Sequence, residues 1–183
     1  SNLFDLFRQF NCGFSFGYWL NALEVIQQMY HDGWRQWKQA EWAGWFLEYR
    51  FNKFTIENNV TDKMRYISQK KEGELDFDIR FEEADFYGDL KASDIKHSDA
   101  PGNDQENLIE CIYKYNRFWY VIYEHETIKD SDCEYKATIA RNRFIRSLDS
   151  SYDKDDMSYS QKMKNSIRFM KMTILELNKI NYR

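Results

Sequence analysis

Hydrophobic positions change their spacing along the chain, and the first stretch has a helical spacing. Between Leu3 and about Asn58 hydrophobic residues recur three or four positions apart, as at Trp19, Leu23, Ile26 and Tyr30. This spacing predicts amphipathic helices, and Gly33 is expected to separate two of them. We therefore expect a helical N-terminal part whose aromatic side chains pack in a core.

The middle of the chain alternates as strands do. Met64–Ser68 predicts a short strand, and residues 74–81 place four hydrophobic side chains on one face and three charged ones on the other. A polar turn at 82–85 leads into a second predicted strand at 86–92. The two strands are expected to form a β-hairpin.

The remaining segments differ in their hydrophobic patterns, and each predicts a different element. Residues 107–115 favour a short crossover helix, and the continuous apolar run at 117–124 is typical of a strand covered on both faces. Residues 135–148 favour a helix and residues 147–160 a polar loop. Residues 167–177 fit either a helix or a strand, because periodicity alone does not separate the two.

Together these elements predict an α/β fold with a mixed sheet flanked by helices. We expect a single domain over residues 1–183, with a helical part at 1–60, a sheet core at about 61–130 and a C-terminal part at 131–183. The hydrophobic content of 43% excludes a disordered chain.

Charge and cysteine content exclude several classes of protein. The chain has 26 basic and 30 acidic residues, a net charge of −4, which excludes a uniformly basic nucleic-acid-binding surface but not a local one. The three cysteines form no CxxC pair, so a zinc ribbon or disulfide framework is not expected, and reduced cysteines suit a cytoplasmic protein. Nucleotide-binding glycine loops and serine-hydrolase or HExxH motifs are also missing from the sequence.

The predicted hairpin carries the residues most suggestive of chemistry. Asp76 lies on the polar face of the first strand, while Asp89 and Lys91 share a face of the second, so the three side chains are expected to converge. Two carboxylates on neighbouring strands suit Mg²⁺, with Mn²⁺ as a substitute, and the carbonyl of Leu90 is a further expected ligand. Asp78 is the alternative to Asp76 as the ligand on the first strand.

Such a cation would polarise a phosphodiester and lower the pKa of a bound water. Lys91 would orient that water and offset charge in the transition state. The pattern therefore indicates phosphodiester hydrolysis.

These residues resemble the motif of the PD-(D/E)XK nuclease superfamily. The resemblance rests on Glu48 in Gly44-Trp-Phe-Leu-Glu48, on Asp76, and on Gly88-Asp89-Leu90-Lys91-Ala92. It covers about residues 41–124 and implies a restriction-endonuclease-like mixed central sheet flanked by helices. It also implies that Asp76, Asp89 and Glu48 hold the metal while Lys91 orients the water, with Glu41 as a weaker candidate.

The resemblance implies a Mg²⁺-dependent DNA endonuclease, best matched by a bacterial intracellular type II restriction enzyme that cuts a specific double-stranded site as a homodimer. A resolvase or repair nuclease of the same fold, or a non-catalytic DNA-binding module, is the alternative. The basic residues expected to contact DNA are Arg141, Arg143, Arg146 and Lys96. His97 is expected in an exposed loop and His125 in a polar cluster at the end of a strand.

Overall fold

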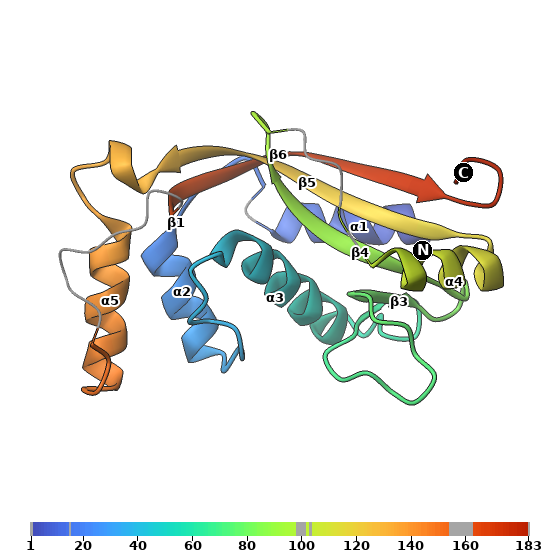
Figure 1. Cartoon of the computed structure of the whole chain (residues 1–183), viewed down its shortest axis with the longest axis horizontal. Helices are drawn as coiled ribbons and strands as arrows, with labels where there is room; N and C mark the ends of the chain where they lie inside the picture. The colour runs from blue at the N-terminus through green and yellow to red at the C-terminus, as the bar shows by residue number, and fades with distance from the viewer. Residues whose placement is uncertain (1, 15, 98–101, 103, 154–162, 183) are drawn as a thin grey trace.

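The computed structural model describes residues 2–14, 16–97, 102, 104–153 and 163–182 (Figure 1). These residues form an α/β structure in which five helices accompany a six-stranded mixed sheet, strongly curled into a half-barrel. The helices are α1 (Leu3–Gly13), α2 (Ala22–His31), α3 (Trp42–Glu57), α4 (Gln105–Tyr115) and α5 (Ala137–Leu148), with a 3₁₀ turn η1 (Asp130–Asp132). The strands are β1 (Trp19–Asn21), β2 (Arg65–Tyr66), β3 (Ile79–Phe81), β4 (Phe86–Asp94), β5 (Phe118–Lys129) and β6 (Lys164–Leu177).

The sheet has the order β1-β6-β5-β4-β3-β2. β4 and β5 are parallel and are connected through α4, as the predicted crossover helix requires, while the other neighbours are antiparallel. The predicted hairpin is confirmed, with β3 and β4 joined by a turn at 82–85. The α/β class and mixed sheet predicted from the pattern are therefore present.

Two sheet boundaries differ from the prediction. β6 is a long strand that pairs along β5, and β1 lies inside the stretch that was expected to be wholly helical. The sheet therefore extends beyond residues 61–130 at both ends of the chain. Pairing with β5 decides the ambiguous segment at 167–177 in favour of a strand, and no local periodicity carries that information.

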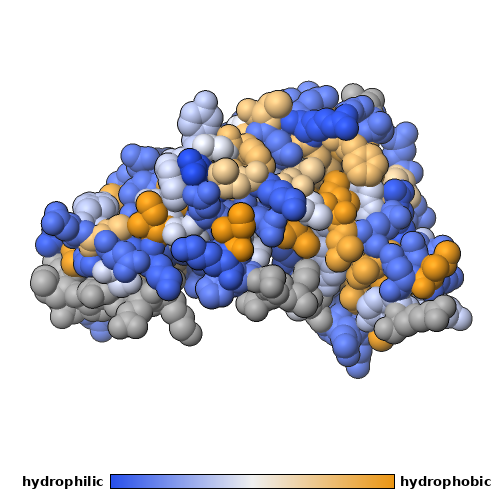
Figure 2. Space-filling view, turned by 90° about the horizontal axis from the view of Figure 1, so that it is seen from above, coloured by the Kyte–Doolittle hydropathy of each residue, from blue (hydrophilic) through white to orange (hydrophobic). Residues whose placement is uncertain are grey.

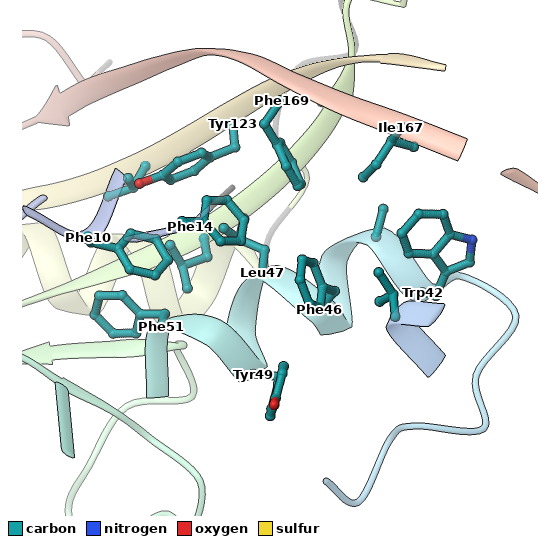
Figure 3. Packing of buried hydrophobic residues seen from close by; sticks show 14 of the residues in the cluster. Phe10, Phe14, Trp42, Phe46, Leu47, Tyr49, Phe51, Tyr123, Ile167 and Phe169 are labelled. Carbon is teal, nitrogen blue, oxygen red and sulfur yellow. The ribbon is translucent and has the colours of Figure 1, made fainter. Parts of the chain in front are cut away.

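Two buried clusters occupy the two faces of the sheet. Beneath the sheet, α1 and α3 contribute aromatic side chains to the larger cluster, which Figure 3 shows from close by. Its labelled aromatic members include Phe10, Phe14, Phe46, Phe51, Tyr123 and Phe169. Most aromatic residues of the first stretch thus pack in the core, as predicted, whereas Phe4, Tyr18 and Trp19 are exposed.

The second, smaller cluster lies where α4 meets β4 and β5 and includes Tyr87, Cys111 and Phe118. Figure 2, which views the molecule from above, shows hydrophobic side chains among hydrophilic ones on the upper surface. Within the described residues, Met170 and Leu175 of β6 are both at least two-fifths exposed. Helices therefore cover the lower face of the sheet more completely than the upper one.

The alternating segment at 74–81 is only partly a strand. Ile79 and Phe81 are buried in the larger cluster, whereas Leu75 and Phe77 are buried in the smaller one. The peptide N–H of Phe77 donates to the carbonyl of Leu75, so the backbone turns before β3 begins. All four hydrophobic residues are buried as predicted, but they do not share one continuous face.

No helix in the described part of the chain is long and apolar enough to cross a membrane.

Candidate active site

Two aspartates meet at the point where β3 and β4 separate. The ladder between these strands ends at the pair Ile79–Gly88, and Asp78 and Asp89 follow on either side. The peptide N–H of Asp78 donates to Asp89 Oδ1 at 3.0 Å, and the peptide N–H of Leu90 donates to Asp78 Oδ2 at 2.9 Å. Each carboxylate thus accepts a backbone hydrogen bond from the opposite strand, which holds both side chains in the gap between the strands.

The aspartate that meets Asp89 is Asp78 rather than Asp76. Asp76 is exposed, whereas the backbone N–H of Asp78 donates to Asp89. Asp78 is also fixed from the other side, because its carbonyl accepts a hydrogen bond from the N–H of Ile67. The structure therefore brings the alternative, Asp78, to Asp89, while the convergence of Asp76 with Asp89 stays a prediction. The turn at residues 75–77 interrupts the alternation on which that prediction rested.

Glu48 is the third acid of the cluster, as its position on the predicted helix suggested. It lies on α3, and the hydroxyl of Tyr66 on β2 donates to its Oε1 at 2.9 Å. Burial is the main cause that raises the pKa of Glu48, and the charge of Asp89 adds to it. Hydrogen bonds with Asp78 and Tyr66 oppose this rise in pKa.

Burial and crowded negative charge raise the pKa of Asp78 far above its usual range. The charges of Asp89 and Glu48, and hydrogen bonds with both side chains, add to the effect of burial. The raised pKa favours the protonated form of Asp78 when no cation is present. We use the name carboxylate cluster for Glu48, Asp78 and Asp89.

Lys91 stands beside the carboxylate cluster, as predicted. Its Nζ lies 2.9 Å from Asp89 Oδ2, and its side chain is 30% exposed whereas that of Asp89 is 8% exposed. The ammonium group therefore lies between the buried acids and the solvent. This is the position from which a lysine can orient a water molecule or contact a phosphate.

The donor chemistry of the carboxylate cluster fits Mg²⁺. Among the described residues, no three His, Cys, Asp or Glu side chains already form a metal-ligand group. Mg²⁺ does not require one, because it retains several waters and usually binds through one or two carboxylates. Asp78 and Asp89 would supply those carboxylates, while ligation by the Leu90 carbonyl stays a prediction.

The weaker candidate, Glu41, has another partner. Its carboxylate accepts from Lys164 Nζ at 2.9 Å, and its side chain is 70% exposed. Glu41 lies just before α3 and lines a small pocket that also reaches Glu48. The structure describes no contact between Glu41 and the two aspartates.

The predicted DNA-contacting residues lie on two separate parts of the chain, the three arginines on α5 and Lys96 just after β4. Arg141 donates to the carbonyl of Lys38, and Arg146 Nε donates to the carbonyl of Tyr152 at 3.4 Å, so both hold neighbouring backbone segments. Arg143 and Lys96 are exposed. Helix α5 packs against α2 at one end of the molecule (Figure 1), so DNA contact by its arginines stays a prediction.

Sequence reasoning missed Tyr66, although the strand that carries it was predicted. Only the pairing of β2 with β3, and the packing of α3 against β2, place its hydroxyl at Glu48. No local pattern signals such a contact.

Comparisons with protein-family models, curated proteins and solved structures find no match.

Proposed function

We propose that this chain is a metal-dependent deoxyribonuclease with a restriction-endonuclease-like core. The observation that carries the proposal is the convergence of Glu48, Asp78, Asp89 and Lys91 from three separate parts of the chain. Burying three acids together is costly unless a cation or a proton compensates their charge. A role in catalysis explains why the fold retains this arrangement.

The resemblance to PD-(D/E)XK nucleases supports the same function once Asp78 takes the place of Asp76. The acids then follow the order expected of the motif, with Glu48 on a helix, Asp78 immediately before β3, and Asp89 two residues before Lys91 on β4. The mixed sheet and the helix between β4 and β5 agree with the fold that the resemblance implies.

Each residue of the site would have a separate role in hydrolysis. Asp78 and Asp89 would hold Mg²⁺ and Glu48 would assist, while Tyr66 fixes the orientation of the Glu48 carboxylate. When bound, Mg²⁺ polarises the phosphodiester and lowers the pKa of a bound water. Lys91, partly in solvent, orients the attacking water and offsets the charge that develops on the phosphate.

Within this class, we favour a type II restriction enzyme that cuts double-stranded DNA as a homodimer, since each active site cuts one strand. Plasmid cleavage with Mg²⁺, Mn²⁺ or EDTA tests the proposal. Discrete fragments that need Mg²⁺ or Mn²⁺ support the restriction enzyme, and a smear or cleavage of branched DNA supports a repair nuclease or resolvase. An intact plasmid under every metal condition, with DNA still bound, would leave a non-catalytic DNA-binding module.

A further inference from the structure

One edge of the sheet has no role in the proposed hydrolysis. β6 pairs with β5 on one side, but on its other side β1 pairs only with residues 166–168 (Figure 1). Among the described residues, no strand pairs with that second side over residues 169–177, which we call the outer edge of β6. A strand edge of this kind presents peptide N–H and C=O groups to which another chain can pair.

A hydrogen bond at the C-terminal end of the outer edge shows which backbone groups face outwards. The carbonyl of Glu176 accepts from Asn181 Nδ2, which belongs to the segment after β6 and not to β5. Along an antiparallel strand, residues alternate between bonding to the partner strand and facing away from it. Ile174 and Met172 therefore face outwards with Glu176, whereas the residues between them bond to β5.

The other end of the outer edge gives the same assignment. The carbonyl of Phe169 accepts from the N–H of Gly17 at 2.8 Å, so it faces away from β5. His125, the partner of Phe169 on β5, accepts from the N–H of Ile95 and so faces β4 instead of β6. A bulge adds one residue to β6 at this point, so Phe169 and Met172 both face outwards although they are three positions apart.

The side chains between these two ends carry no charge. Met172 and Ile174 pack partly against the larger buried cluster, whereas Thr173 and Leu175 lie on the opposite face and are exposed. Proteins commonly protect a strand edge from pairing with charged residues. The outer edge has no such protection over these four positions.

We propose that the outer edge of β6 pairs with the same edge of a second copy of this chain, about a two-fold axis at Thr173. Met172 and Ile174 lie symmetrically on either side of Thr173, so Met172 of each copy meets Ile174 of the other. Each such pair forms two reciprocal N–H···O=C bonds of an antiparallel ladder. A single interface therefore satisfies the outward-facing groups of both copies, as closed two-fold symmetry requires.

The side chains that would face one another across this axis are compatible. Thr173 lies opposite Thr173 of the second copy, a pairing that stabilises antiparallel strands. Lys171 lies opposite Leu175, so no like charges meet, and the methylene groups of the lysine can cover the leucine. Asn11 of α1 donates to the sulfur of Met172 at 3.5 Å, which places α1 of each copy beside the interface.

The choice of a second copy, in preference to another polypeptide, rests on the proposed function, because cutting both strands of DNA requires two active sites. A two-fold axis between antiparallel strands is perpendicular to the sheet, so the same face of each copy lies on the same side of the dimer. β5 separates β6 from β4, and the interface therefore leaves both carboxylate clusters open.

The test places opposite charges at the proposed axis of the intact chain. In sedimentation experiments the parent chain should be a dimer that dissociates on dilution, because a short ladder is small beside the roughly 1,200 Å² of a stable interface. Thr173→Lys and Thr173→Glu should each be monomers, because like charges would then oppose one another. An equimolar mixture of these two variants should form the dimer again, and Ile109→Lys, at an exposed position of α4, should behave as the parent does.

Three results would overturn the proposal. They are a parent chain that is monomeric at every concentration, a dimer that persists in both folded Thr173 variants, and monomeric variants whose mixture does not recombine. Amide hydrogen exchange tests the parent chain without any substitution. The N–H groups of Met172 and Ile174 should exchange more slowly as the dimer forms, whereas that of Thr173, bonded to β5, should exchange slowly at all concentrations. Fast exchange of Met172 and Ile174 in the dimer would also contradict pairing at this edge.

The same preparations separate the failure of this interface from the failure of the proposed function. A dimer that depends on Thr173 but cuts no DNA with any metal would support the interface and remove the proposed nuclease. A monomer that cuts DNA in a metal-dependent manner would keep the nuclease and overturn the interface.

Discussion

At the scale of single residues, the choice between Asp76 and Asp78 shows what the sequence could and could not predict. Alternation identified an acidic strand beside Asp89 and Lys91, and both of the latter lie where they were expected. The same alternation continues through Leu75 and Phe77, although the backbone turns there. The hydrophobic pattern therefore could not show which aspartate faces the second strand.

The hydrogen bond from Tyr66 to Glu48 gives a prediction about catalysis. Tyr66→Phe removes the donor but keeps the ring that packs against Trp34. We expect the cleavage rate to fall roughly tenfold, because a misoriented Glu48 no longer supports the site, with little change in DNA affinity. Cleavage kinetics and DNA binding measured on the same preparation check this, and Tyr113→Phe, at an exposed tyrosine of α4, is the matched control.

Stability should depend on pH through His125. Burial lowers the pKa of this ring in the folded protein, whereas the unfolded chain keeps a value near 6.5. As pH falls through 6.5 the unfolded state gains a proton first, so the free energy of unfolding should decrease below that pH. In urea titrations between pH 8 and 5, His125→Gln should reduce this decrease, while His97→Gln should leave it unchanged.

At the scale of elements, packing between strands explains both the successes and the failures of the sequence analysis. α4 and β5 were predicted from local patterns because each has its own hydrophobic face or run. β1 depends on pairing with residues more than 140 positions away, as for Trp19 and Arg168, and the full length of β6 depends on its pairing along β5. Such pairing leaves no regular signal in either segment.

The close packing of β4 against its neighbours predicts a large effect at one glycine. A Cβ at Gly88 would lie 2.8 Å from both the Phe81 ring and the carbonyl oxygen of Trp119, whereas a Cβ at Gly44 in α3 meets nothing within 4 Å. We expect Gly88→Ala to destabilise the protein by about 1–3 kcal/mol, because a backbone carbonyl cannot move away.

Gly44→Ala should instead be neutral or stabilising by up to about 1 kcal/mol, because alanine favours the helix. Urea denaturation of both variants checks the pair. Equal stability of the two variants would contradict the described packing of β4.

At the scale of the whole molecule, an acidic chain that binds DNA needs local basic surfaces. The net charge is −4, and the predicted basic residues divide into those that hold the structure, Arg141 and Arg146, and those that are exposed, Arg143 and Lys96. Substituting the exposed pair keeps the hydrogen bonds that Arg141 and Arg146 donate to backbone carbonyls, so this pair is the more direct test of DNA contact.

We expect the double variant Arg143→Ala, Lys96→Ala to bind DNA more weakly. Its DNA affinity should also depend less on salt concentration. The slope of log affinity against log salt should decrease in magnitude by about 0.9 for each phosphate that the variant no longer neutralises. Fluorescence anisotropy at several salt concentrations checks this prediction, with Arg8→Ala as a control on the exposed surface of α1. An unchanged slope would place the DNA elsewhere on the molecule.

The central claim is that the carboxylate cluster, with Asp78 and not Asp76, carries out metal-dependent DNA cleavage. Its most direct test is Mg²⁺-dependent plasmid cleavage by Asp78→Asn and Asp76→Asn, two substitutions of the same kind only two residues apart. Asp78→Asn should lower the cleavage rate by a factor on the order of 10²–10⁴ or more while the protein stays folded and bound to DNA, and Asp76→Asn should cut at the parent rate. Full activity in the Asp78 variant, or loss of activity in a folded Asp76 variant, would contradict this account.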